Sequence, residues 1–231
     1  MSRRDELAAN LAEVRARLAA ACADEGRDPA GVTLVAVSKT WPAADVRLLA
    51  GLGVADFGEN RDQEAAPKAA ELTDLALSWH FVGQLQTNKC RSVARYASVV
   101  HSVDRPRLVR VLGQEASRAG REVTALVQVS LDEVEGRGGA PPGEVERLAD
   151  LVAGTAGLRL GGVMAVAPQG ADPDPAFARL REVAAALVAT HPGATIVSAG
   201  MSGDLESAIR HGATHVRVGT ALFGRRDADL R

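Results

Sequence analysis

Cysteine, aromatic residues and long apolar runs are all scarce in this sequence. Its two cysteines, Cys22 and Cys90, are too few for a disulfide framework or a cysteine-bound zinc site, so we expect two reduced thiols. No segment approaches the roughly 18 consecutive apolar residues that cross a membrane. Residues 1–6 are charged rather than apolar, unlike the start of a secretory signal. These absences favour a cytoplasmic protein that does not span a membrane.

An excess of charge of either sign is also lacking, since 27 basic residues stand against 29 acidic ones and the formal net charge is −2. This balance provides no basic field for binding nucleic acid or an anionic membrane, and it favours a small-molecule ligand. With 231 residues, 46% of them hydrophobic, the chain can bury a substantial core. No linker or change in composition divides it, so we expect a single domain over residues 1–231.

What the chain does contain is a regular alternation of apolar runs and helical patterns. Apolar residues at steps of three and four from Leu7 to Cys22 predict a helix from Arg3 to Glu25. Eight short apolar runs then follow as predicted strands, at residues 32–39, 54–60, 78–83, 99–104, 124–131, 157–167, 195–202 and 215–223. Between them lie predicted helices at residues 43–51, 61–72, 85–95, 106–119, 142–153, 175–190 and 203–211.

This alternation predicts an α/β protein in which helices cover a parallel sheet. Eight strands favour a closed (β/α)8 TIM barrel over an open doubly wound sheet. No Gly-x-Gly-x-x-Gly follows a predicted strand, which disfavours dinucleotide binding. Because the functional site of such a barrel forms at the carboxyl ends of its strands, polar residues at those ends are the candidates for the site.

Lys39 ends the first predicted strand, on the same side of it as Val35 and Val37. A partly buried lysine at the barrel mouth would supply the neutral amine that a Schiff base requires. For a lysine alone, a stem lying on apolar surface with its ammonium in solvent is the more common situation. The choice between these interpretations depends on what lies opposite Lys39.

The last two predicted strands both end in small and hydroxyl-bearing residues. The seventh runs into a turn with Ser198, Gly200, Met201 and Ser202, and the eighth ends with Arg217, Gly219 and Thr220. Glycines, hydroxyls and backbone N–H groups suit an anion, and the loops after strands seven and eight are where barrels most often bind phosphate. Ser202 as an ordinary helix cap would need no ligand. Together, and opposite Lys39, the two ends predict a phosphate-binding cup.

Two further strand ends contribute polar groups. Asn60, after the second strand, could hydrogen-bond a phenolic oxygen. His80 lies within the third strand, where a satisfied core histidine is more frequent than a catalytic base, and both interpretations stay open. The other histidines show no metal-ligand spacing with cysteines or carboxylates, so no metal is predicted.

Six segments in one order carry a resemblance to a known family: residues 35–39 (VAVSK), 57–61 (FGENR), 79–89 (WHFVGQLQTNK), 101–104 (HSVD), 200–204 (GMSGD) and 217–224 (RVGTALFG). Over residues 7–224 the chain resembles the pyridoxal phosphate homeostasis proteins, the YggS/PROSC group. It departs from them at Ala199, where many relatives carry methionine, and at residues 136–139, where a lysine is frequent. Neither departure touches Lys39.

The resemblance implies a barrel like the N-terminal domain of alanine racemase, with pyridoxal 5′-phosphate (PLP) held as a Schiff base on Lys39. It also implies that Arg217 faces the pyridine nitrogen and that residues after strands seven and eight hold the phosphate. The residues expected to contact the cofactor are Lys39, Asn60, His80, Ser198, Gly200, Met201, Ser202, Arg217, Gly219 and Thr220.

A protein that holds and delivers PLP, with little or no catalysis, is the function that the resemblance implies. An always-charged Arg217 would keep the ring nitrogen unprotonated and so weaken the cofactor as an electron sink. A two-base racemase needs a tyrosine opposite the lysine, and the single tyrosine, Tyr96, is expected near the wrong rim of the barrel. A single-domain racemase or lyase using His80 or water remains an alternative, as does a barrel that binds another phosphorylated metabolite without a covalent bond.

Partners follow from the same interpretation. We expect a monomer that binds PLP and passes it to apo PLP-dependent enzymes. The other lysines, Lys68 and Lys89, could assist release of the cofactor. The glycine-containing stretch at residues 132–142 is predicted to be a mobile loop.

Overall fold

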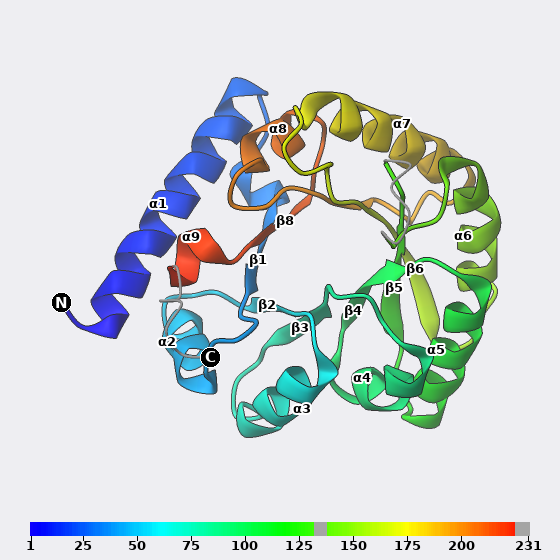
Figure 1. Ribbon diagram of the computed structural model, residues 1–231, viewed down its shortest axis with the longest axis horizontal. Helices are drawn as coiled ribbons and strands as arrows, with labels where there is room; N and C mark the ends of the chain where they lie inside the picture. The colour runs from blue at the N-terminus through cyan, green and yellow to red at the C-terminus, as the bar shows by residue number, and fades with distance from the viewer. Residues whose placement is uncertain (132–137, 225–231) are drawn as a thin grey trace.

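The computed structural model describes residues 1–131 and 138–224 of the chain. Within them, parallel strands close into a barrel in sequence order, with β1 pairing both β2 and β8 (Figure 1). The strands are β1 (Thr33–Val37), β2 (Asp56–Glu59), β3 (Ser78–Phe81), β4 (Val99–Val103), β5 (Val123–Gln128), β6 (Leu158–Met164), β7 (Ile196–Ser198) and β8 (His215–Val218). The predicted (β/α)8 barrel is therefore confirmed.

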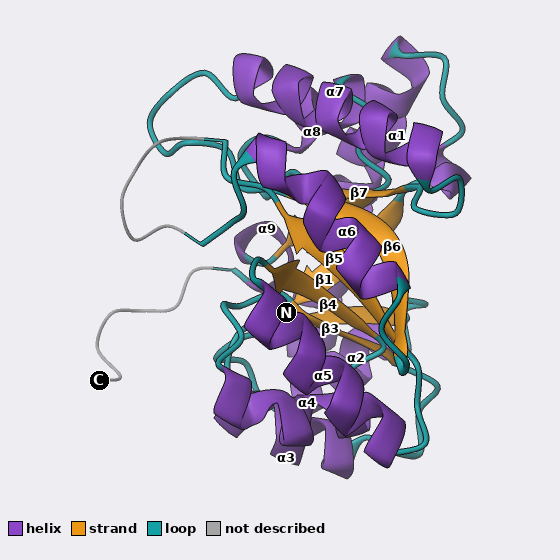
Figure 2. Cartoon of the chain, turned by 90° about the vertical axis from the view of Figure 1, so that its right-hand side faces the viewer, coloured by secondary structure: helices purple, strands orange, loops and turns teal. Residues whose placement is uncertain are grey.

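Helices form a layer outside the strands (Figure 2). They are α1 (Arg3–Asp24), α2 (Ala43–Ala50), α3 (Asp62–Glu71), α4 (Cys90–Tyr96), α5 (Pro106–Arg118), α6 (Val145–Ala153), α7 (Asp174–Thr190), α8 (Leu205–Arg210) and α9 (Thr220–Phe223). Short 3-10 turns at Pro29–Gly31, Thr87–Lys89 and Pro142–Glu144 precede β1, α4 and α6. None of the helices in the described part of the chain is long and apolar enough to cross a membrane.

The first helix illustrates how local sequence sets an element. Ser2 and Asp5 form a capping box, in which each side chain accepts a hydrogen bond from the other residue's backbone N–H. The predicted apolar stripe from Leu7 to Cys22 is buried, and it packs α1 against α2, α8 and α9. The helix thus covers the part of the barrel where β8 meets β1 (Figure 1).

Some predicted boundaries are wrong. The eighth strand was expected to reach Phe223, but it ends at Val218, and residues 220–223 form α9. The neighbouring strand β1 ends at Val37, so β8 has no strand to pair with beyond Val218. The backbone N–H groups of Leu222 and Phe223 instead donate hydrogen bonds to the Gly219 carbonyl, within a helical turn. The seventh strand stops at Ser198 because Gly200 turns the chain with φ +87°.

Two other expectations differ in detail. The helix expected at residues 85–95 begins later, with a 3-10 turn at Thr87–Lys89 followed by α4. In the stretch predicted to be a mobile loop, residues 132–137 lie outside the described residues. Beyond them the chain rejoins the barrel, since Ala140 and Val129 form a parallel bridge.

Candidate functional site

Lys39 stands two residues beyond the carboxyl end of β1. Val37 and Lys39 both line a cavity of about 770 Å³ at this end of the barrel, while Ser38 between them is fully buried. Lys39 is exposed, so the expectation of a partly buried lysine is wrong. The next residue, Thr40, has φ 67°, an unusual conformation for a β-branched residue. Its N–H donates to Glu64 at 2.8 Å, which helps to hold the turn.

A buried ion pair supports the same strand end from outside the barrel. Lys68 on α3 contacts the Glu59 carboxylate and donates to the Ser38 carbonyl at 2.9 Å. The Ser38 hydroxyl also donates to Glu59, at 2.6 Å. Lys68 therefore positions the residue before Lys39, and it does not line the cavity.

The loops after β7 and β8 supply the opposite wall of the cavity. Ser202 and Gly203 come from the first loop, and Gly219 and Thr220 from the second. The two loops are joined, because the Ser202 hydroxyl accepts a hydrogen bond from the Ala221 N–H at 3.3 Å. With its oxygen engaged in this way, the hydroxyl proton of Ser202 is available to an anion in the cavity. A Cβ added at Gly203 would meet nothing within 4 Å, so this backbone is open to close approach.

Arg217 on β8 lies deepest in the site. Its guanidinium donates to the Ser198 hydroxyl at 2.6 Å and to the Ala165 carbonyl at 3.0 Å. Burial lowers the pKa of Arg217 to about 10, against the opposing attraction of Asp204, so the side chain is still charged at neutral pH. A guanidinium carries five N–H donors, and those not used in these bonds can face the cavity that Arg217 lines.

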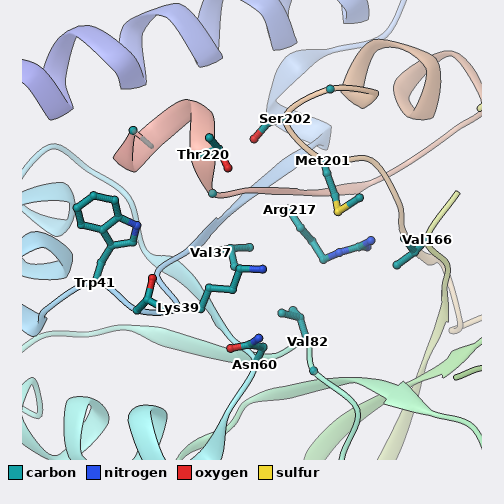
Figure 3. Close-up of a pocket in the computed structure, with 15 residues that line it drawn as sticks. Val37, Lys39, Trp41, Asn60, Val82, Val166, Met201, Ser202, Arg217 and Thr220 are labelled. Carbon is teal, nitrogen blue, oxygen red and sulfur yellow. The ribbon is translucent and has the colours of Figure 1, made fainter. Parts of the chain in front are cut away.

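Asn60 closes the cavity on the side of β2. Its Oδ1 is buried without a hydrogen-bond partner among the described residues, which marks a polar atom that a ligand could satisfy. Gly83 allows Asn60 to take this position, since a Cβ at residue 83 would stand 2.1 Å from the backbone carbonyl oxygen of Asn60. In Figure 3 the Lys39 side chain extends towards the middle of the cavity, between Asn60 on one side and Ser202 and Thr220 on the other.

The structure brings most of the predicted site residues together, but not all. Lys39, Asn60, Met201, Ser202, Arg217, Gly219 and Thr220 line one cavity. His80, Ser198 and Gly200 do not line it. His80 and Ser198 are buried inside the barrel, and Gly200 packs beneath its loop, where an added Cβ would come within 2.6 Å of the Ala208 Cβ.

Sequence reasoning missed several cavity residues, of which Trp41 is the most informative. Trp41 lines the cavity, stacks on Phe223 with ring centroids 5.7 Å apart, and carries the Arg3 guanidinium 4.6 Å from its own ring. Its position two residues after Lys39 was the available signal. Val82 and Val166, which also line the cavity, are ordinary strand-end valines that no pattern distinguishes.

Tyr96 does not line the cavity. It ends α4, as expected, and burial, then the charges of Asp62 and Glu59, raise the pKa of its hydroxyl above the usual range. Lys89 Nζ stands 4.0 Å from Asp62 Oδ2, outside the cavity that Lys39 lines. Within the described residues, no tyrosine faces Lys39 across the cavity.

The fold and this cavity define a class of protein: a single barrel of the kind that begins alanine racemase. Residues 3–227 match the family described as "Alanine racemase, N-terminal domain". The alanine racemase of Clostridium difficile has the same fold, with a TM-score of 0.74 at 14% identity, over 97% of this chain and 58% of that one.

Relatives of similar length are more similar to this chain in sequence than this racemase is. A curated protein of Pseudomonas aeruginosa named "Pyridoxal phosphate homeostasis protein" is 45% identical over 224 residues, covering 96% of each chain. The crystal structure of PipY from Synechococcus elongatus, described as "with PLP bound", has a TM-score of 0.83 at 37% identity, over 94% of this chain and all of that one. The chain thus belongs to the alanine racemase N-terminal domain family and, within it, to the pyridoxal phosphate homeostasis proteins. The resemblance stated from the sequence is confirmed.

Proposed function

We propose that this protein binds PLP covalently through Lys39 and holds it for delivery, with little or no catalysis of its own. The observation that carries the proposal is one cavity with a lysine amine on one wall and two joined hydroxyl- and glycine-containing loops on the other (Figure 3). An aldehyde on one end and a phosphate on the other match these two walls. The PLP bound to PipY supports the same ligand.

Each wall has a distinct part in binding. Lys39 Nζ would form the covalent bond, and Ser202, Gly203, Gly219 and Thr220 would hold the phosphate through hydroxyl and backbone N–H groups. The Asn60 side chain, whose Oδ1 has no hydrogen-bond partner within residues 1–131 and 138–224, would meet the phenolic oxygen or its proton. Arg217 would donate a hydrogen bond to the ring nitrogen. PLP, when bound, supplies an electron sink for chemistry at the α-carbon of amino acids.

The residues of this site favour holding over turnover. Arg217 is charged at neutral pH and can only donate hydrogen bonds, so it disfavours protonation of a ring nitrogen beside it. In the described part of the chain, no tyrosine lines the cavity to act as a second base opposite Lys39. The names of the curated relatives describe homeostasis, which agrees with a carrier.

The expected recipients are apo PLP-dependent enzymes, and we propose that the protein is a single-domain monomer in the cytoplasm. Cys22 and Cys90 are both unpaired and buried, as expected for thiols kept in a reducing compartment.

Covalent attachment tests the proposal directly. The purified protein with PLP should show near-visible absorption, and borohydride reduction followed by peptide mapping should mark Lys39. Lys39→Ala should lose the absorption, whereas the matched variant Lys89→Ala, altered outside this cavity, should keep it. Unchanged covalent binding by Lys39→Ala would refute the assignment. If the unaltered protein binds phosphorylated compounds but shows no near-visible absorption with PLP, a non-covalent site for another phosphorylated metabolite is favoured.

Turnover distinguishes the carrier from an enzyme. With a panel of D- and L-amino acids, α-proton exchange should stay far below ordinary enzyme rates. Exchange at about 1 per second or faster would overturn the carrier and restore the racemase or lyase alternative.

A further inference from the structure

Arg217 is the first member of a buried chain of hydrogen bonds that runs through the barrel interior. The Ser198 hydroxyl, which accepts from Arg217, lies 2.9 Å from His101 Nδ1. His101 Nε2 lies 2.8 Å from His80 Nδ1, and His80 Nε2 lies 3.0 Å from Asp56 Oδ1. Asp56 is the first residue of β2, so the chain links the cavity at the carboxyl ends of the strands to their amino ends.

The top of this chain offers an acceptor for the proton of Ser198. A guanidinium can only donate, so the Ser198 oxygen accepts from Arg217 and its own proton must go elsewhere. Among the described residues, the other hydrogen-bond partner of Ser198 Oγ is His101 Nδ1, which can accept that proton. Burial, with a further contribution from the charge of Arg217, holds the pKa of His101 well below its usual value, so the ring is neutral. A neutral ring that accepts at Nδ1 carries its proton on Nε2.

The bottom of the chain requires the same direction. The His101 Nε2–H donates to His80 Nδ1, which leaves the His80 proton on Nε2, opposite Asp56. Burial opposes ionisation of Asp56, but the hydrogen bond from His80 and the other polar neighbours of Asp56 together lower its pKa, so a carboxylate accepts this proton. In the opposite arrangement of a neutral His80, two acceptors would face each other between His80 and Asp56. The Asp56 end thus selects one tautomer for each histidine, and the Ser198 end is compatible with it.

Two neighbours complete the surroundings of His80. The Ser78 hydroxyl lies 3.3 Å from His80 Nε2 and shares that side of the ring with Asp56. The His215 ring stands 6.1 Å away, centroid to centroid, and burial lowers its pKa to about 4. His215 is therefore neutral at pH 7 and brings no charge beside the chain.

We propose that Ser198, His101, His80 and Asp56 are positioning residues, which together hold the Arg217 guanidinium in one orientation at the floor of the cavity. The carboxylate of Asp56, at the far end of the barrel, fixes the tautomers of both histidines, and these fix the Ser198 hydroxyl against Arg217. Ser198 thereby acts on Arg217 and not on a phosphate. The effect on the cofactor rests on the proposed function, but the tautomers do not.

Histidine NMR tests the chain without any cofactor. In the PLP-free protein at neutral pH, a long-range ¹H–¹⁵N spectrum should show His80 and His101 as neutral rings protonated at Nε2, with the five histidines assigned by single substitutions. In Asp56→Asn, whose amide can donate as well as accept, His80 and His101 should populate both tautomers. A charged ring, or a proton on Nδ1 of either residue in the unaltered protein, would overturn the proposal.

PLP binding tests the positioning role. Ser198→Ala and Asp56→Asn should each weaken PLP binding about tenfold, the scale of one hydrogen bond to a charged group, and shift the near-visible absorption maximum. Matched controls are Ser207→Ala, which loses a hydroxyl bonded to Asp174, and Asp150→Asn, which alters a His191–Asp150 contact of 2.9 Å outside the barrel. Both controls should bind PLP within twofold of the unaltered protein.

The outcomes separate this proposal from the proposed function. Folded Asp56→Asn and Ser198→Ala proteins with unchanged affinity and spectrum would refute the positioning role. If the unaltered protein binds no PLP, the proposed function fails, while the tautomers measured without PLP still decide whether the polarised chain exists.

Discussion

The buried ion pair between Lys68 and Glu59 leads to a quantitative prediction for Lys68→Met. Only 7% of the Lys68 side chain and 1% of the Glu59 side chain are exposed. Removing the ammonium leaves the Glu59 carboxylate in the interior with the Ser38 hydroxyl as its remaining hydrogen-bond partner among the described residues. It also removes the donor to the Ser38 carbonyl. Uncompensated buried charges of this kind cost about 3–5 kcal/mol of unfolding free energy. For a protein of this size, that loss lowers Tm by roughly 6–20 °C.

Urea denaturation at pH 7, followed by far-UV circular dichroism, measures this loss. The double variant Lys68→Met with Glu59→Gln should be more stable than Lys68→Met alone, because the buried charge is gone. The control is Arg47→Met at the surface pair with Asp74, whose side chains are 46% and 58% exposed, and it should leave the unfolding midpoint unchanged. A loss below about 1 kcal/mol for Lys68→Met, or a double variant no more stable than it, would refute the reasoning.

Three further predictions follow from single positions. Gly83→Ala should displace Asn60 and weaken PLP binding, because the new Cβ would stand 2.1 Å from the backbone carbonyl oxygen of Asn60. The control Gly31→Ala, whose Cβ would meet nothing within 4 Å, should bind PLP normally, and equal affinities of the two variants in titrations would contradict this prediction. Thr40→Asn should stabilise the fold by about 1 kcal/mol in urea denaturation, since asparagine tolerates φ 67° better than threonine; a destabilised variant would show that Thr40 is not strained. Acidification from pH 6.5 to 4 should reduce stability, because the pKa of His215 is lowered from 6.5 to about 4, and the folded protein binds fewer protons than the unfolded chain in that range. His215→Gln should flatten the decline, and an unchanged pH profile would exclude a contribution from His215.

The order of elements and the end of the barrel that carries the site were both predictable from the sequence. A strand covered on both faces must be apolar along its length, and it must be followed by a helix before the next parallel strand. Polar residues such as Lys39 and Arg217 that interrupt this pattern at a strand end therefore stand out, and the structure places both on the cavity. The motifs at residues 79–89 and 200–204 identify the family, which the spacing of strands and helices alone could not do.

Side-chain direction was not predictable, because it depends on strand pairing and on what fills the barrel interior. His80 lies in β3 and Ser198 ends β7, and both were predicted to contact the cofactor. Their side chains instead lie inside the barrel, where His80 contacts His101 and Ser198 contacts Arg217. Lys68 has no strand-end signal, and only the packing of α3 against β2 brings its ammonium to Glu59.

The sequence by itself thus determined that a barrel forms, which loops meet at its mouth and which lysine follows its first strand, but it wrongly predicted that this lysine is partly buried. Tertiary structure alone decided how that site is held. Residues as far apart as Asp56 and Arg217 are connected through buried hydrogen bonds, and in a closed barrel each such group must find its partner on another strand.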